Sequence, residues 1–196
     1  MSTKPSLSSK NFEIEVKLEI SDLQKIRQQL KKLGFHERLH RKFEDNWILD
    51  FAKRPLFKAH SLLRLREFDE KFLVAFKAPP SRSAHFKIRE ELETEVADGV
   101  AFREILKRLG LLPSFRYQKY RSVFAEKKAV KSKKITVSID ETPIGSYLEI
   151  EGPRKTIREI AACLGYNQRD FITQSYWELY VRKALRSRRR EMVFEK

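Results

Sequence analysis

The amino-acid sequence predicts an α+β fold in which eight antiparallel β-strands form a barrel with a charged interior, flanked by helices. Eight segments of the 196-residue chain alternate apolar and polar side chains, a pattern typical of strands with two unlike faces. In seven of these segments the alternate positions carry charged residues, and both signs recur. Amphipathic helical stretches lie between and after them, and their apolar faces can cover the strands.

The first strand is predicted over residues 12–20, where apolar and charged residues alternate without a break. A helix follows, because Ser21 and Gln24 have the spacing of a capping box and apolar residues then recur at helical spacing. Gly34 ends this helix. Four further strands are predicted over residues 42–51, 60–68, 71–78 and 86–96.

The second half of the chain continues the alternation of helices and strands. Asp98 is predicted to cap a helix that ends at Gly110. A third helix ends at Gly165, and Ser175 with Glu178 has the spacing to cap a fourth. Three more strands are predicted over residues 115–125, 135–140 and 146–151, with a basic turn over 127–134.

One folded domain is expected over residues 11–181, between a disordered polar leader (1–10) and a basic C-terminal tail (182–196). A single cysteine excludes a disulfide framework and favours a reducing, cytoplasmic setting. No apolar run approaches the length of a membrane span, so no membrane partner is expected. The formal net charge of +15 favours polyanionic partners such as nucleic acid or a phosphorylated small molecule.

The charged positions of the predicted strands permit two interpretations. They form the solvent face of an antiparallel sheet, or they line a barrel whose apolar faces are covered by helices. These positions are almost all ionised and rich in arginine, whereas exposed strand faces usually include serine, threonine and glutamine. A charged interior is costly unless a charged ligand needs it. A polyphosphate with a divalent metal ion is such a ligand, because bases bind phosphate oxygens and carboxylates bind hard cations.

The residues at these alternate positions are eight bases and seven acids. The bases are Lys17, Arg64, Arg66, Lys77, Lys87, Arg89, Lys119 and Arg121. The acids are Glu13, Glu15, Glu91, Glu93, Asp140, Glu149 and Glu151. Eight positive against seven negative charges leave the predicted interior at +1, so the excess charge of the chain lies elsewhere.

Several strand motifs follow one another in a particular order. Glu-x-Glu-x-Lys stands at residues 13–17, an acidic and aromatic strand at 44–50, and Leu-Arg-Leu-Arg at 63–66. Further motifs stand at residues 76–79, 89–93, 119–121 and 148–152. This set resembles the CYTH family, also called triphosphate tunnel metalloenzymes, which includes class IV adenylate cyclases and thiamine triphosphatases. The resemblance covers nearly the whole predicted domain and implies an eight-stranded antiparallel triphosphate tunnel.

The resemblance also implies roles for the charged residues. The expected ligands of Mg²⁺ or Mn²⁺ are Glu13, Glu15, Glu91, Glu93, Asp140, Glu149 and Glu151. The residues expected to bind the triphosphate are Arg64, Arg66, Lys77, Lys87, Arg89, Lys119 and Arg121. Lys17 is the expected catalytic residue, which orients the nucleophile or contacts phosphate. The alternative is that the acids and bases pair with one another as interior salt bridges.

The implied function is that of a divalent-metal-dependent enzyme whose substrate is ATP, tripolyphosphate or thiamine triphosphate. Attack by water makes it a triphosphatase, whereas attack by the ribose 3′-hydroxyl of ATP makes it a class IV adenylate cyclase. The residues leave this choice open. Two other classes remain: a domain that binds polyphosphate without turnover, and an RNA-binding module that uses the basic tail. The oligomeric state is unknown from the sequence.

Overall fold

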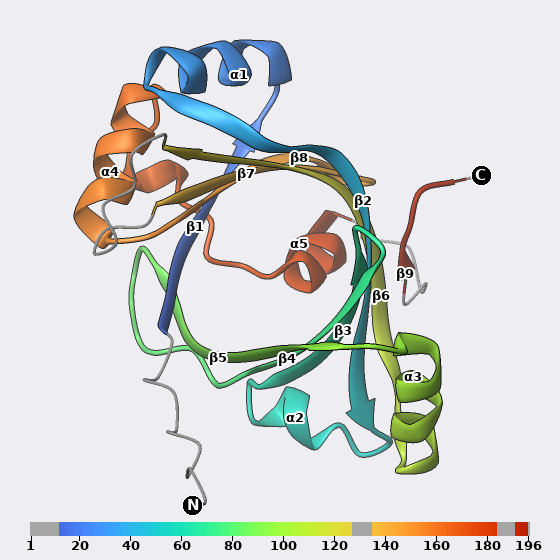
Figure 1. The fold of residues 1–196 in the computed structure, drawn as a ribbon. Coiled ribbons are helices and arrows are strands. Elements are labelled where there is room, and N and C mark those ends of the chain that lie inside the picture. The colour runs from blue at the N-terminus through green and yellow to red at the C-terminus, as the bar shows by residue number, and fades with distance from the viewer. Residues whose placement is uncertain (1–11, 127–134, 184–190, 196) are drawn as a thin grey trace, which may run out of the picture.

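The computed structural model describes residues 12–126, 135–183 and 191–195, and within them the chain forms a closed barrel (Figure 1). Its strands are β1 (Phe12–Ile20), β2 (Phe35–Phe51), β3 (Leu62–Phe68), β4 (Lys71–Lys77), β5 (Lys87–Val96), β6 (Leu111–Glu126), β7 (Thr136–Thr142) and β8 (Gly145–Glu151). Neighbouring strands are antiparallel in the order β2-β3-β4-β5-β1-β8-β7-β6, and pairing of β2 with β6 closes the circle. The predicted eight-stranded antiparallel barrel is confirmed.

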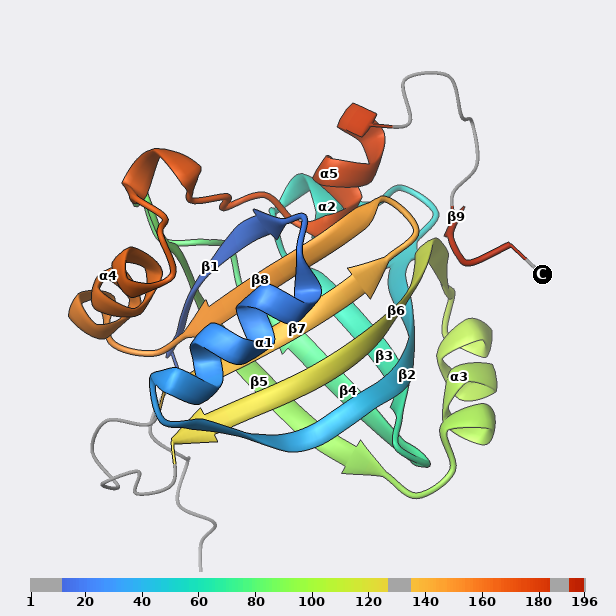
Figure 2. The ribbon, with the colours of Figure 1, turned by 90° about the horizontal axis from the view of Figure 1, so that it is seen from above.

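The barrel is apolar outside and charged inside, as β1 illustrates. Val16 and Leu18 are fully buried in an outer core, whereas Glu15 and Lys17, which alternate with them, lie inside the barrel. Helices α1 (Leu23–Lys32) and α4 (Arg154–Cys163) cover this outer core. Figure 2 shows α1 lying across the outer face of β7 and β8. Of the two interpretations of the charged strand faces, the structure has the barrel interior.

A second outer core lies under α3 (Gly99–Arg108), on the far side of the barrel from α1. Leu106 of α3 packs there against Leu49 of β2 and Leu65 of β3. The Asp98 side chain accepts a hydrogen bond of 2.9 Å from the Ala101 amide, so the predicted cap of this helix is confirmed. The short helix α2 (Pro55–Lys58) connects β2 to β3.

Helix α5 (Tyr176–Lys183) lies within the ring of strands when the barrel is viewed as in Figure 1. Figure 2 places α5 and α2 at the same end of the barrel. The first residues of α5 pack against aromatic side chains of β6 and β8, and Leu179 is fully buried. Ser175 and Glu178 form the predicted capping box, in which the Glu178 carboxylate accepts from the Ser175 amide at 2.7 Å. Helix α5 therefore closes much of this end of the barrel.

Some predicted boundaries were wrong. Asp22, not Ser21, caps α1, because its carboxylate accepts from the Lys25 amide at 2.9 Å. Strand β2 begins at Phe35 instead of residue 42, and β6 begins at Leu111 instead of residue 115. Register shifts on both sides of Leu39 interrupt the two-residue period of β2, which is why the alternation did not reveal its first half.

The C-terminal region also forms structure. Arg182 and Lys183, the first residues of the predicted tail, belong to α5. Glu191–Met192 form a short strand, β9, that runs parallel to β6 and pairs with Arg116 and Tyr117. The predicted leader, the basic turn and residues 184–190 of the tail lie outside the described residues. No helix among the described residues has the length and apolarity to cross a membrane.

Candidate active site in the barrel interior

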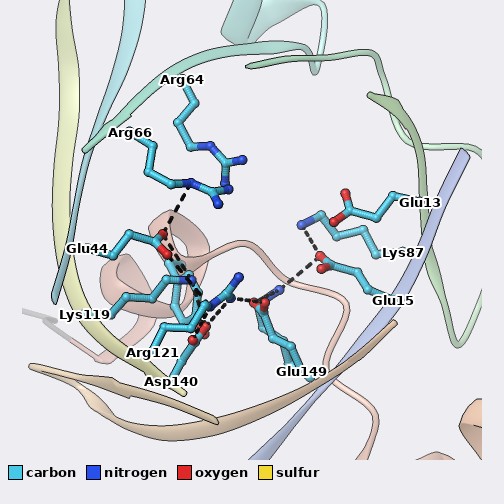
Figure 3. Close-up of polar contacts among 12 residues, drawn as sticks. Glu13, Glu15, Glu44, Arg64, Arg66, Lys87, Lys119, Arg121, Asp140 and Glu149 are labelled. Carbon is cyan, nitrogen blue, oxygen red and sulfur yellow. Dashed lines mark hydrogen bonds and ion pairs between the residues drawn. The ribbon is translucent and has the colours of Figure 1, made fainter. Parts of the chain in front are cut away.

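The barrel encloses a cavity of about 310 Å³ that is lined by charged side chains from β1, β3, β4, β5, β6 and β8. Because every second residue of a strand points the same way, the alternating sequence directs these side chains inward. Figure 3 shows them pointing toward one another from opposite walls. Lys17 and all seven bases predicted to bind substrate line this cavity.

Strand β1 contributes a group of acids and bases at one wall. Glu15 accepts from Lys17 Nζ at 3.2 Å and from Lys87 Nζ at 2.7 Å. Lys17 also forms an ion pair of 3.1 Å with Glu149 of β8. Burial of Glu15 opposes its ionisation, but Lys17 and Lys87 together hold the pKa of this carboxyl well below its usual range. The two lysines therefore favour the ionised form of Glu15.

A second group lies on the wall formed by β2, β6 and β7. Asp140 is fully buried and accepts from Lys119 Nζ at 2.8 Å and from Arg121 Nε at 2.6 Å. Its third donor is the Tyr176 hydroxyl of α5, at 2.7 Å. Arg121 bridges the two walls, because its guanidinium also pairs with Glu149. Asp140 is thus saturated by three donors.

Glu44 of β2 joins the same wall. It is fully buried, and its carboxylate lies 3.4 Å from Lys119, 3.6 Å from Arg66 and 3.8 Å from Arg121. Although burial opposes ionisation, these three cations hold its pKa well below the usual range. Neither carboxylate oxygen has a hydrogen-bond partner of ordinary geometry among the described residues, so Glu44 acts through charge alone.

The third wall is formed by β3, β4 and β5. Arg64 donates to Glu91 at 3.3 Å and to Glu93 at 3.2 Å. Lys77 pairs with Glu91 at 3.0 Å and with Glu13 at 2.5 Å. Arg64 and Lys77 therefore each pair with two carboxylates.

Carboxylates also crowd one another where β1 and β8 meet. Glu15 and Glu151 are direct cross-strand partners. Burial of the carboxyl, and then repulsion from Glu13 and Glu15, raises the pKa of Glu151 to about 7. Burial and repulsion from Glu15 likewise raise the pKa of Glu13. Crowded oxygen donors with raised pKa values are the chemistry that a hard divalent cation relieves.

The predicted acids are divided between several positions. Glu13, Glu15 and Glu149 line the cavity, and Glu151 lies beside them on β8. Glu91 and Glu93, which pair with Arg64, and Asp140, which is held by Lys119 and Arg121, do not line the cavity. Within the described ranges, no three acidic or histidine side chains already have the arrangement of a metal site. The donor chemistry near β1 therefore fits a divalent cation, but the carboxylates must move to bind it.

Sequence reasoning missed three residues of this site: Glu44, Tyr176 and Arg54. Glu44 alternates with Asn46 and Ile48 on β2, and its neutral companions hid the inward face. Tyr176 enters from a helix, so no strand pattern marks it. Arg54 precedes α2 and lines the cavity from a turn.

Comparison with known proteins agrees with this architecture. The model of the CYTH domain family matches residues 11–166, which is most of the chain. The chain therefore belongs to the CYTH family. Its eight-stranded barrel lined by opposed charges is the fold that the resemblance implied.

Individual relatives agree with this assignment. A Methanocaldococcus jannaschii protein named "Putative adenylate cyclase MJ0240" is 31% identical over 179 residues, which span 86% of this chain and 98% of that protein. A Vibrio parahaemolyticus structure, also described as a "putative adenylate cyclase", has a TM-score of 0.75 at 18% identity, over 87% of this chain and 98% of its own. A Hippeastrum protein, described as a "putative adenylyl cyclase" that reveals a dominant triphosphatase activity, has a TM-score of 0.57 at 19% identity, over 89% of this chain and 97% of its own. The last two similarities show the fold.

Proposed function

We propose that this protein is a divalent-metal-dependent enzyme that acts on a triphosphate substrate held inside the barrel. The observation that carries the proposal is the cavity of about 310 Å³ with basic side chains on all its walls. Basic groups from opposite walls can contact one linear polyanion along its length. Membership of the CYTH family and the names of the relatives support the same conclusion.

The acids near β1 would hold Mg²⁺ or Mn²⁺. Glu13, Glu15 and Glu149 line the cavity, and the crowding around Glu151 favours a cation there. When bound, the metal ion would polarise a phosphoryl oxygen and neutralise charge that develops on it. The roles of Asp140, Glu91 and Glu93 as metal ligands remain proposals, and a supporting role is favoured because these three acids pair with bases without lining the cavity.

Seven of the bases that line the cavity are preorganised for phosphate because carboxylates already hold them. Lys87 is held by Glu15, Lys77 by Glu13 and Glu91, and Arg121 by Glu149. A triphosphate would bind by taking these cations over from the acids, which frees the acids for the metal ion. The bases then stabilise charge that spreads over the phosphate oxygens as the P–O bond breaks. Lys17, held between Glu15 and Glu149, would contact phosphate or orient the nucleophile.

Triphosphate hydrolysis is the reaction we favour. When water is the nucleophile, the site does not need to recognise a nucleobase or a sugar, so hydrolysis requires fewer specific contacts than cyclisation. Formation of cyclic AMP from ATP is the second candidate, and the name of the Methanocaldococcus relative favours it. Both reactions would use the same contacts between basic side chains and the triphosphate. The substrates to compare are ATP, tripolyphosphate and thiamine triphosphate. The remaining alternative is a module that binds polyphosphate or RNA without turnover.

Product analysis tests the proposal. The purified protein is incubated with each of the three triphosphates and with Mg²⁺ or Mn²⁺, and the products are separated by anion-exchange chromatography. The variant with Glu13→Ala and Glu15→Ala serves as the blank. Orthophosphate above the blank supports a triphosphatase, and cyclic AMP with pyrophosphate supports a cyclase. Wild-type protein that matches the blank on all substrates would overturn the enzymatic proposal.

A further inference from the structure

The cavity extends from the charged interior to the end of the barrel that carries α2 and α5. Two arginines line this mouth: Arg54, which precedes α2, and Arg89 of β5. Arg89 donates a hydrogen bond of 3.0 Å to the carbonyl oxygen of His60, just after α2. Arg54 and the residue that Arg89 contacts therefore flank the same short helix.

The backbone around α2 is fixed in an uncommon conformation. Arg54 and His60 both have a φ of 54°, in the left-handed region that residues other than glycine rarely adopt. The Asp50 carboxylate stabilises this turn by accepting from the amides of Phe57 at 2.9 Å and Leu56 at 3.2 Å. The Arg54 guanidinium carbon lies 4.1 Å from the centre of the Phe57 ring, which orients the side chain at the mouth.

These two arginines differ from every other base that lines the cavity. Nine lysine and arginine residues line it, and seven of them have a carboxylate within ion-pair distance. For Arg54 and Arg89, no such carboxylate exists among residues 12–126, 135–183 and 191–195. The Nε group of each is also buried without a hydrogen-bond partner there, a property that Arg64 and Arg66 share, so the missing carboxylate is what distinguishes the two. Buried donors of this kind need an acceptor.

We propose that Arg54 and Arg89 form a subsite at the mouth for a phosphoryl group beyond the three that the interior binds, which replaces the contact with the triphosphate itself expected for Arg89. The bases of the interior are shared with acids, whereas these two guanidinium groups are free to bind an anion without displacing one. Guanidinium is the preferred partner of phosphate oxygens because of its planar, forked donors. The proposal rests on the proposed function, since it assumes that the interior holds a triphosphate.

Two sources provide a fourth phosphoryl group at this position. One is a linear inorganic polyphosphate longer than three units, and the other is the first phosphodiester of a 5′-triphosphorylated RNA. Both carry the same anionic oxygens to the mouth. The test therefore compares tripolyphosphate with tetrapolyphosphate, and ATP with a 5′-triphosphorylated dinucleotide.

Titration calorimetry in EDTA measures binding without turnover. For the wild type, we expect tetrapolyphosphate to bind more tightly than tripolyphosphate. Arg54→Gln is expected to reduce this preference about tenfold, the effect of one charge-assisted hydrogen bond. Lys53→Gln is the matched control, because it removes one positive charge from the neighbouring exposed residue, which does not line the cavity. The dinucleotide arm shows whether the phosphodiester uses the same subsite.

An unchanged preference in Arg54→Gln, or equal loss in the Lys53→Gln control, would overturn the proposal. Arg54→Lys, which keeps the charge, guards against a folding defect and is expected to retain part of the preference. If the wild type bound neither polyphosphate, both the subsite and the proposed function would be wrong. If it bound both without hydrolysing either in Mg²⁺, only the enzymatic proposal would fail.

Discussion

The Tyr176 hydroxyl of α5 donates a hydrogen bond of 2.7 Å to Asp140 of β7, 36 residues earlier in the chain. The Tyr176 ring also lies 5.2 Å from the Nζ atoms of both Lys17 and Lys119. One side chain from outside the barrel wall thus contacts an acid and two bases of the interior. Helix α5 therefore helps to hold the charge network in place as well as closing the barrel.

The Tyr176→Phe variant tests the hydroxyl alone. We expect it to lower the free energy of unfolding by about 2 kcal/mol, because a buried carboxylate loses one of its three donors. Tyr176→Leu is expected to cost more, since it also removes the ring from beside two lysines. Urea unfolding measures both. Tyr166→Phe is the control, because its hydroxyl makes an exposed hydrogen bond of 3.4 Å. Equal stability of Tyr176→Phe and wild type would contradict this role.

The barrel could be predicted because apolar and charged residues alternate along strands such as β1. On β1 the alternation of acids and apolar residues predicts both faces, and the structure has Glu15 inside and Val16 outside. The first half of β2 escaped prediction because bulges break the alternation and place Arg41 at a positive φ.

The site was less predictable than the fold, for a physical reason. The alternation of apolar and charged residues predicts which strand residues face inward, but it does not predict which acid pairs with which base. Asp140 faces inward as predicted, yet its neighbours Lys119 and Arg121 occupy its oxygens. Tyr176 and Arg54 reach the interior from a helix and a turn, whose positions depend on tertiary packing.

Glu151 is expected to make the stability of the metal-free protein depend on pH. Its folded pKa of about 7 lies above the ordinary value of 4.5, so the folded state binds its proton more tightly than the unfolded state. This contribution is fully present below pH 4.5 and is lost as the pH rises through 7. The side chain is partly exposed, so solvent screening reduces the effect.

Thermal unfolding between pH 5 and 8 (~3 pH units) measures this dependence. Glu151→Gln is expected to remove part of the decrease in Tm, by about 3 °C, the shift that 1 kcal/mol gives in a domain of this size. Glu159→Gln, on the exposed face of α4, is the control. Mg²⁺ is expected to reduce the same decrease, because a bound cation favours the ionised carboxyl. Identical pH profiles for Glu151→Gln and wild type would refute the assignment.

The arginines of residues 186–190 are expected to affect RNA binding without affecting triphosphate hydrolysis. Replacing Arg186, Arg188, Arg189 and Arg190 by glutamine keeps β9, whereas truncation would also remove Met192, which is 1% exposed. If these arginines contact phosphates of single-stranded RNA, each contact contributes about 0.7 to the salt dependence of binding. Filter binding at several salt concentrations measures the slope.

The matched variant for this experiment is Met192→Ala, which leaves the charges intact. It is expected to lower stability by about 2–5 kcal/mol, since it removes a buried side chain beside Tyr117 and Tyr180, and to leave the salt dependence unchanged. An unchanged slope in the arginine variant would show that the basic segment makes no phosphate contacts.

Glu44 and Asp45 are adjacent acids on opposite faces of β2, and their replacement by amides separates the interior from the exterior. Glu44 is fully buried among Lys119, Arg66 and Arg121, whereas Asp45 pairs on the outside with Arg116, at 2.6 Å. Glu44→Gln removes the negative charge that three buried cations share. We expect it to lower the free energy of unfolding by about 3–5 kcal/mol. Asp45→Asn breaks a partly exposed pair and should cost about 1 kcal/mol.

The variant that loses more stability, Glu44→Gln, is expected to bind tripolyphosphate more tightly than Asp45→Asn does. Glu44→Gln makes the cavity more positive by one charge, so tripolyphosphate should bind more tightly and restore part of the lost stability. Asp45→Asn changes no charge inside the cavity and should bind like the wild type. Urea unfolding with and without tripolyphosphate measures both quantities together. Weaker binding in Glu44→Gln would mean that this carboxylate positions Lys119 and Arg121 for phosphate instead of competing with it.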